Sequence, residues 1–201
     1  SQCALLPARQ AWEQAGSPQI GSQRLAVSVS PGMGPVLSVM EAWDTLRDRG
    51  PRRVLPTAVP ALMPNAPAAA VGIDLGAQAG IHAPVSACAS GAEAIAYGAD
   101  LIALGRADVV VAGGTDAALH PMTVAAFAAM RALSTRNADP QTASRPFAPD
   151  RDGFVLGEGA GLLVLERAAH AKARGARILA VLAGSGVTAD AYDVARPEPS
   201  G

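Results

Sequence analysis

One cysteine lies where a reactive nucleophile would be expected. Cys88 stands in the run Ser86-Ala87-Cys88-Ala89-Ser90-Gly91, between a short apolar segment at 81–87 and an Ala-rich stretch at 93–106. We therefore expect a strand that turns sharply into a helix at Cys88. A thiol at a helix N-terminus lies near unpaired amides and the positive end of the backbone dipoles, which favours the thiolate. Small neighbours leave room for an acyl group, and the Cys88 amide would face a developing oxyanion.

The alternative interpretation of Cys88 is a buried structural cysteine, because free cysteine is among the most buried residue types. The second cysteine, Cys3, has a different context, and a reducing compartment makes a bridge to Cys88 improbable. We expect both to be free thiols.

Helical and strand patterns alternate along the chain, which predicts an α/β fold with a sheet covered on both faces. The apolar run at 109–112 is typical of a buried strand. The expected helices are 4–15, 36–49, 66–75, 93–106, 124–133 and 166–174, and the expected strands are 24–30, 81–87, 109–112, 161–165 and 178–182. A loop is expected over 51–60 and an irregular stretch over 188–201.

Composition excludes several classes of protein. The 201 residues are 50% hydrophobic and 16% charged, which favours a globular domain with one sizeable core. The net charge of −1 gives no reason to expect nucleic acid as a partner. No apolar run approaches the ~20 residues of a membrane span, and no signal peptide is recognisable, so we expect a cytoplasmic protein.

Four stretches, in this order and at this spacing, resemble motifs of the β-ketoacyl-acyl-carrier-protein synthases, the condensing enzymes of fatty-acid synthesis. The resemblance covers essentially the whole chain, and it is closest to the actinobacterial long-chain branch that elongates mycolic-acid precursors. The stretches are Ser86-Ala87-Cys88-Ala89-Ser90-Gly91, Asp108-Val109-Val110-Val111-Ala112-Gly113-Gly114, Met130-Arg131-Ala132-Leu133-Ser134-Thr135-Arg136-Asn137, and Ala143-Ser144-Arg145-Pro146-Phe147 followed by the segment 150–159.

The resemblance implies a thiolase-like αβαβα fold of five layers, built from two similar halves. Residues 1–176 would be most of the N-terminal, cysteine-bearing half, and 177–201 would begin the C-terminal half, so the chain would be a fragment truncated at both ends. A homodimer is expected, because the family's strand before the cysteine pairs with its twin across a two-fold axis. That strand would be 81–86, and it would be an apolar edge if left unpaired.

By the same resemblance, Cys88 accepts an acyl group from a carrier thioester, and decarboxylation of a malonyl thioester then supplies the carbanion for a Claisen condensation. The family provides two histidines and a lysine from its second half for that second stage. His82, His120 and His170 match none of these positions. We therefore expect this segment alone not to condense substrates. The resemblance implies no metal and no organic cofactor.

Three residues match positions of the family's acyl channel. Met33 and Phe127 correspond to residues that gate and wall it. Ala58 stands where other synthases carry a bulky aromatic side chain that crosses the dimer interface, so the smaller side chain predicts a deeper channel for long acyl chains.

Other matches concern the carrier protein. Arg52, Arg53 and Arg131 correspond to positions that contact the acidic acyl carrier protein. Asp190 and Asp193 belong to a stretch that resembles a mobile loop, although the family usually has histidine at the position of Asp193, which leaves the behaviour of this loop open.

Three alternatives remain. A ketosynthase of a type II polyketide system shares the nucleophile motif and would differ in acyl-chain preference. A catalytically silent partner subunit usually lacks the nucleophile, so Cys88 argues against it. A segment with no activity of its own is the third.

Overall fold

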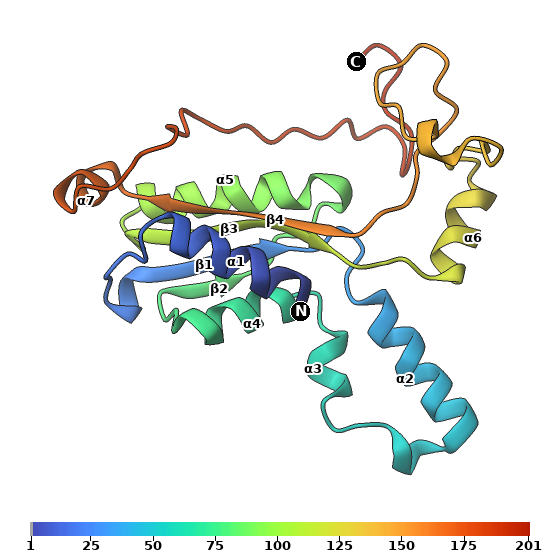
Figure 1. Cartoon of the computed structure of the whole chain (residues 1–201), viewed down its shortest axis with the longest axis horizontal. Coiled ribbons are helices and arrows are strands. Elements are labelled where there is room, and N and C mark those ends of the chain that lie inside the picture. The colour runs from blue at the N-terminus through green and yellow to red at the C-terminus, as the bar shows by residue number, and fades with distance from the viewer. Residues whose placement is uncertain (1) are drawn as a thin grey trace.

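The computed structural model describes residues 2–201, and its centre is a four-stranded sheet in the order β2-β1-β3-β4 (Figure 1). β1 (Leu25–Ser30) pairs in parallel with β2 (Gly80–His82) and with β3 (Val109–Asp116). β4 (Gly159–Glu166) runs antiparallel to β3. β2 and β4 are therefore the two edges of the sheet.

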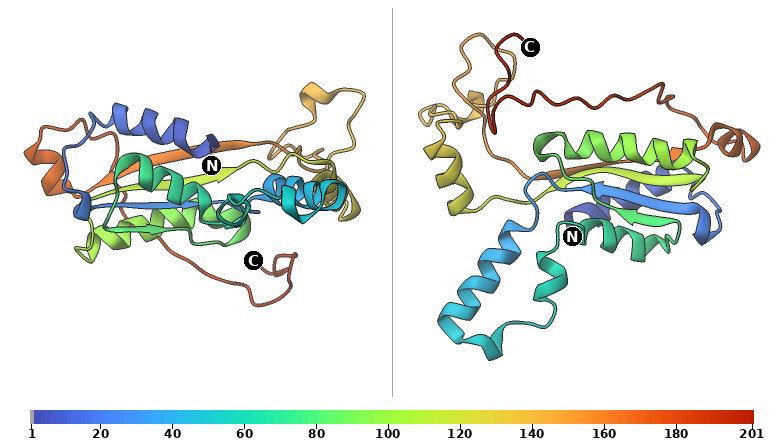
Figure 2. Two further views of the ribbon diagram at one scale, coloured as in Figure 1. Left: turned by 90° about the horizontal axis from the view of Figure 1, so that it is seen from below. Right: turned by 180° about the vertical axis from the view of Figure 1, so that it is seen from behind.

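Helices cover both faces of this sheet, as predicted, and the α/β class is confirmed. α1 (Gln2–Gln14) and α4 (Ala66–Leu75) pack on one face, and α5 (Ser90–Ala103) packs on the other (Figure 2). The remaining helices are α2 (Val36–Arg49), α3 (Ala58–Leu62), α6 (Pro121–Ala129) and α7 (Ala168–Ala173), with short 3₁₀ turns η1 (Ser22–Arg24), η2 (Pro51–Arg53), η3 (Ala87–Ala89) and η4 (Pro140–Thr142).

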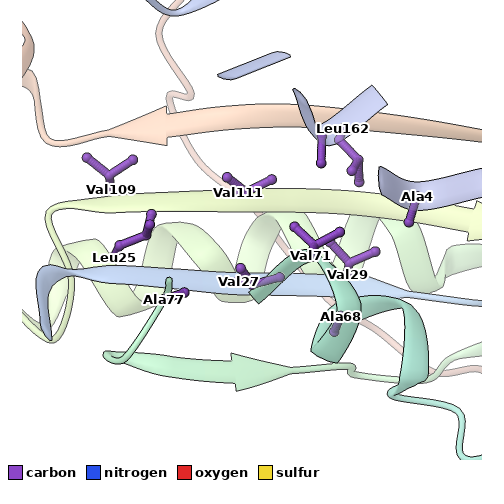
Figure 3. Packing of buried hydrophobic residues seen from close by; sticks show 11 residues of the cluster. Ala4, Leu25, Val27, Val29, Ala68, Val71, Ala77, Val109, Val111 and Leu162 are labelled. Carbon is purple, nitrogen blue, oxygen red and sulfur yellow. The ribbon is translucent and has the colours of Figure 1, made fainter. Parts of the chain in front are cut away.

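The period-two alternation of β1 and β3 distributes their side chains between two cores. Val27, Val29, Val109 and Val111 join the cluster under α1 and α4 (Figure 3). The intervening Ala26, Val110 and Ala112 join the cluster under α5. Every residue of β1 is buried, and each fully buried valine contributes about 1.5–3 kcal/mol. This double burial explains why β1 is apolar or small throughout and why β3 is so as far as Thr115.

Glycines let α5 approach the sheet closely. A β carbon on Gly98 would lie 3.1 Å from Val110 Cγ1, and one on Gly91 would lie 3.1 Å from the Cα of Gly114. The first turn of α5 is therefore in direct contact with the backbone of β3. This contact places the segment before α5, which includes Cys88, at the carboxyl ends of β1 and β3.

Ion pairs join the elements at the opposite end of the sheet. Asp108 accepts two hydrogen bonds from Arg24, at 2.8 and 3.0 Å, and lies 2.8 Å from Arg167 Nη2. The Arg24 hydrogen bonds hold the pKa of the Asp108 carboxyl below its usual value. These contacts connect the starts of β1 and β3 with the end of β4.

A second cluster lies at the same end. Glu166 accepts from Arg174 Nε at 2.7 Å and Nη2 at 2.6 Å, and it contacts His170 Nδ1. Arg174 also donates to the carbonyl oxygen of Ala15, just beyond α1. The Arg174 hydrogen bonds are the main cause that lowers the pKa of Glu166. The cluster therefore ties β4 and α7 to the end of α1.

β3 and β4 are longer than the predicted strands 109–112 and 161–165, and two other predicted strands differ more strongly from the structure. The strand expected over 81–87 is confined to Gly80–His82, and residues 83–86 are irregular. The strand expected over 178–182 is wrong: these residues form no strand, and Leu179 and Val181 are exposed. After α7 the chain runs past the α5 face without joining either sheet edge (Figures 1 and 2). An apolar sequence becomes a strand only where a neighbour supplies its hydrogen bonds.

Most of the predicted helical boundaries also differ by a few residues, including both ends of α1 and α7. The expected loop over 51–60 contains η2 and the start of α3. α6 begins at Pro121, before the predicted start, because the His120 side chain caps it by accepting a hydrogen bond from the Met122 amide at 3.1 Å. α5 begins at Ser90, before the expected start at residue 93. Helices α2 and α4 have the predicted bounds.

Candidate functional site

Cys88 lies in η3, immediately before the first residue of α5, and its side chain is exposed. The alternative of a buried structural cysteine is therefore wrong. Cys3 and Cys88 are both free thiols, as expected. The position agrees with the predicted junction, although an irregular segment, and not a strand, leads into it.

A sharp elbow presents Cys88. The residue before it, Ala87, has φ +51°, in the left-handed region that residues with a β carbon rarely adopt. Holding such a residue there costs on the order of 1–3 kcal/mol, so other contacts must fix it. Two of them come from one side chain: Ser90 Oγ accepts from the Ser86 amide at 2.8 Å and donates to the Ala87 carbonyl at 2.6 Å. Ser90 is 1% exposed.

A cavity of about 280 Å³ opens beside Cys88, at the carboxyl ends of β1 and β3. Ligands of α/β sheets bind at this end of the strands. The lining is mostly backbone and small side chains, and among the described residues it includes no histidine, lysine or arginine. Its members are Ser30, Gly32, Ala87, Cys88, Ser90, Gly91, Gly114, Thr115, Asp116, Gly159, Ala160 and Gly161.

Asp116 fixes the loop that follows β1. Its carboxylate accepts hydrogen bonds from the amides of Gly32 at 2.7 Å and Met33 at 3.3 Å. A β carbon on Gly32 would lie 2.7 Å from Asp116 Oδ2 and 3.1 Å from the carbonyl oxygen of Ala87. Glycine is therefore required for this loop to pack between the carboxylate and the elbow.

A second cavity, of about 160 Å³, lies behind the same loop. Ser30 and Gly32 line the first cavity, and Pro31 and Gly34 line the second. Other lining groups of the second cavity include Cys3, Leu37, Ala61, Pro64 and Pro67. The segment 30–34 thus contributes to both cavities, as do Thr115 and Asp116, and it separates the cavity that holds the thiol from the second one.

His82, His120 and His170 line neither cavity, and the expectation that they take no part in catalysis stays a prediction. The His82 ring packs against Tyr97 with centroids 4.9 Å apart, and burial, together with Arg106, lowers its pKa. His120 caps α6, and His170 contacts Glu166.

The three residues predicted for the acyl channel lie on separate segments. Met33 is in the β1–α2 loop and 45% exposed, Ala58 is the first residue of α3, and Phe127 on α6 packs edge-to-face on Phe154 at 5.0 Å. None of them lines either cavity. Their role as channel residues stays a prediction.

The residues predicted to dock the carrier are exposed. Arg52 and Arg53 form η2 at the end of the projecting α2 arm, and Arg131 follows α6 with φ +56° (Figure 1). Asp190 and Asp193 lie in the exposed stretch after α7, where their carboxylates accept the amides of Glu198 and of Ala195 and Arg196. These roles also stay predictions.

Sequence reasoning missed Ser90, Asp116 and Gly32 as parts of the site. Ser90 offered a signal, because a small hydroxyl residue in the first turn of a helix often bonds to nearby backbone. Asp116 and Gly32 are 84 residues apart in the chain, and their contact arises only from the parallel pairing of β1 and β3.

Residues 2–201 contain neither a candidate metal cluster nor a helix that could span a membrane. Within residues 2–201, no group of three or more His, Cys, Asp or Glu side chains is placed to hold a metal ion. No helix in this range combines the length and the apolar character that crossing a bilayer requires.

Residues 1–171 match the family model of the beta-ketoacyl synthase N-terminal domain. The chain is 48% identical over 194 residues to 3-oxoacyl-[acyl-carrier-protein] synthase 2 of Mycobacterium tuberculosis, which covers 96% of this chain and 46% of that protein. It is 46% identical over 180 residues to the enzyme of the same name from Staphylococcus aureus, covering 90% and 44%. The chain spans less than half the length of these curated relatives.

Two solved ketosynthase structures also resemble this chain. The chain matches a beta-ketoacyl synthase from Burkholderia phymatum with a TM-score of 0.76 at 37% identity, over 87% of this chain and 43% of that one. It matches a type II polyketide synthase ketosynthase, solved in complex with its acyl carrier protein and bound to a hexaketide, with a TM-score of 0.78 at 30% identity, over 88% and 45%.

Proposed function

The chain belongs to the β-ketoacyl synthase family, and on that premise we propose that the protein is a 3-oxoacyl-[acyl-carrier-protein] synthase in which Cys88 accepts the acyl group. The observation that carries the proposal is the exposed Cys88 on a strained elbow, beside a cavity at the N-terminus of α5. The reaction proposed is fatty-acid elongation. The resemblance to the mycolic-acid branch makes long-chain precursors the favoured substrates.

In the first stage, Cys88 Sγ attacks the carbonyl carbon of an acyl-carrier thioester. A bond from Sγ to that carbon forms, the carbon–sulfur bond to the carrier breaks, and the carrier thiol leaves with the proton lost by Cys88. The small lining of the cavity leaves space for the thioester. The backbone amide of Cys88 is the proposed donor to the oxyanion, where one such donor contributes about 10²–10³ in rate.

In the second stage, a malonyl thioester loses carbon dioxide, and the resulting carbanion attacks the acyl group on Cys88. The new carbon–carbon bond forms as the bond to Sγ breaks, which returns the thiolate. Enolate charge needs hydrogen-bond donors at the malonyl carbonyl. The side chains lining this cavity include no histidine or lysine among the described residues. We propose that the family's histidine pair and lysine supply them, and that residues 1–201 alone do not condense substrates.

The test separates the two stages. The full-length protein and its Cys88→Ala variant are incubated with an acyl-carrier thioester, and the mass of the Cys88 peptide is followed. We expect acylation of Cys88 in the parent and none in the variant, while Cys3→Ser acylates normally. Acylation of both proteins, or of neither, contradicts the proposal.

Acyl-chain length is the finer part of the proposal. Ala58 leaves volume where other synthases place an aromatic ring, so the channel accepts long chains. Profiling Ala58→Phe with donors of increasing length should show a shift toward short chains. An unchanged preference would reject this assignment.

Carrier docking rests on charge. Arg52, Arg53 and Arg131 are exposed, and charge pairs at a rim act mainly on encounter. Reversing Arg52 and Arg53 should raise the KM for carrier-bound substrate and spare a free thioester analogue, and equal effects would argue against docking. Asp190 and Asp193 are proposed to belong to the loop that admits the carrier's arm.

Dimerisation is proposed through β2. This strand is one edge of the sheet, with Ile81 36% and Val85 56% exposed near it. An unpaired apolar edge invites strand addition. Charged substitutions at Ile81 and Val85 should convert a dimer into monomers in sedimentation, and an unchanged mass would reject this interface. Action in the cytoplasm stays a prediction.

A type II polyketide ketosynthase is the second candidate, because a ketosynthase of that kind shares the fold at 30% identity. Acyl-chain profiling distinguishes a polyketide ketosynthase from a fatty-acid enzyme, since the latter extends saturated chains. A catalytically silent subunit is disfavoured by the exposed Cys88, and the acylation experiment above decides.

A further inference from the structure

The nucleophile elbow depends on a side chain that is itself not a nucleophile. Ala87 holds φ +51° although it has a β carbon, and its neighbour Ser86 has φ −139° and ψ 47°. This pair of conformations reverses the chain direction just before Cys88. Because alanine gains nothing from the left-handed region, the conformation must be imposed by contacts from outside the turn.

Ser90 supplies contacts on both sides of that residue. Its Oγ accepts from the amide of Ser86, one residue before Ala87, and donates to the carbonyl of Ala87 itself. The Ser90 amide also donates to the same carbonyl. The hydroxyl thus uses its acceptor and its donor to bracket the strained peptide, in a site that is almost completely buried.

The position of Ser90 is fixed in turn by the sheet. Its neighbour Gly91 packs against the backbone of Gly114, so the first turn of α5 is held against the end of β3. The Ala87 carbonyl is also the group against which Gly32 packs. A movement of the elbow would therefore displace both Cys88 and the Gly32 segment that lines the cavity.

We infer that Ser90 is a positioning residue, which sets the direction of the Cys88 thiol by holding Ala87 in the left-handed conformation. The inference rests on the proposed function of Cys88 as acyl acceptor. Without the hydroxyl, the Ser86 amide loses its acceptor and Ala87 relaxes toward negative φ. The thiol then leaves the reactive position, and misplacement of a reacting group by about 1 Å costs up to about 100-fold in rate.

A matched control exists in the same protein. Ser28 is also completely buried, on β1, and its Oγ has no hydrogen-bond partner among the described residues. Ser28→Ala and Ser90→Ala delete the same atom from equally buried positions, but only Ser90→Ala removes a bond to the elbow. Any effect of deleting a buried hydroxyl as such appears in both variants.

The experiment measures single-turnover acylation of Cys88 in the full-length protein by mass spectrometry, with steady-state kcat and KM beside it. We expect Ser90→Ala to acylate about 10- to 100-fold more slowly than Ser28→Ala, with a lower kcat and an unchanged KM for the carrier substrate. Ser90→Thr, which keeps the hydroxyl, should restore most of the rate. Equal acylation rates in Ser90→Ala and Ser28→Ala overturn the inference.

A second variant keeps the test decisive if Ser90→Ala does not fold. Glycine adopts positive φ at no steric cost, so Ala87→Gly combined with Ser90→Ala should fold and recover acylation to within about tenfold of Ser28→Ala. A folded double variant that stays slower overturns the inference. If the parent protein itself leaves Cys88 unacylated, the proposed function fails, and that result is distinguishable from failure of the Ser90 argument.

Discussion

The two ends of the sheet are built from different kinds of contact. At the amino ends of β1 and β3, charged side chains converge: Asp108 binds Arg24 and Arg167, and Glu166 binds Arg174. At the carboxyl ends, glycines and small side chains surround Cys88, and most bonds involve the backbone. Long side chains at the second end would fill the space that a substrate needs. The comparison indicates that ion pairs stabilise the packing at the amino ends of the strands, whereas the carboxyl ends keep a cavity for substrate.

The largest change in stability is expected from a substitution at Gly113, where two backbone segments pack closely at the carboxyl end of the sheet. This glycine has φ +153°, and a β carbon there would overlap the carbonyl oxygen of Gly161 and lie 2.8 Å from Leu162 Cδ2. Gly113→Ala should therefore separate β3 from β4 and lower the free energy of unfolding by about 3 kcal/mol. Urea denaturation measures it. Gly157→Ala, with open space around it, should change this free energy by less than about 0.5 kcal/mol, and equal losses would break the comparison.

Glu166 tests the opposite end. Its side chain is 9% exposed and bonded to Arg174, and hydrogen bonds to a charged group contribute about 1.5–3 kcal/mol. Glu166→Gln should lower the free energy of unfolding by about 2 kcal/mol and leave acylation of Cys88 unchanged. The exposed Asp48, paired with Arg47, offers a control, since Asp48→Asn should not shift the urea midpoint. A large loss of acylation in Glu166→Gln would contradict the separation of the two ends.

The pH dependence of stability also measures the contribution of the Glu166 carboxylate. The pKa of Glu166 is lowered in the folded protein, chiefly by hydrogen bonds from Arg174. The stabilisation is therefore complete above the ordinary glutamate value of 4.5 and is lost as the pH falls through the lower folded-state value. Urea midpoints measured between neutral and acidic pH should fall less steeply in Glu166→Gln than in the parent. Parallel curves would show that this carboxylate carries none of the dependence.

The smallest change in stability is expected for Asp116. This residue combines features of both ends of the sheet, because it is a carboxylate that lies at the open, carboxyl end. In Asp116→Asn one of the two carboxylate oxygens becomes an NH2 group, which cannot accept a hydrogen bond, so one of the two bonds from the Gly32 and Met33 amides is lost. We expect a loss of about 1 kcal/mol in the free energy of unfolding and slower acylation of Cys88, because Gly32 packs against the elbow.

The control for Asp116 is Asp152→Asn. Asp152 also accepts from a backbone amide, that of Thr135 at 3.0 Å, and it does not line the cavity. It should lower stability and spare acylation. Equal acylation in both variants would show that the Asp116 bonds do not matter for the elbow.

Local pattern was sufficient where a segment's own residues decide its structure. The bounds of α2 and α4, the burial of β1 and β3 on both faces, and the junction at Cys88 were predictable because periodicity and composition act over a few residues. The apolar segment 178–182 shows the limit of this reasoning. It has the composition of a strand, but strand formation needs a partner, and no sheet edge receives it.

By itself, then, the sequence determined the fold class, the family motifs and the candidate nucleophile, since these depend on contiguous residues. Only the tertiary structure decided how Cys88 is presented. The contact of Asp116 with Gly32 spans 84 residues, and the cavity needs β1, β3, β4 and the start of α5 together. The left-handed Ala87 is likewise stable only because Ser90 and the packed end of α5 hold it. Such geometry depends on the distances between separate elements, which no local pattern contains.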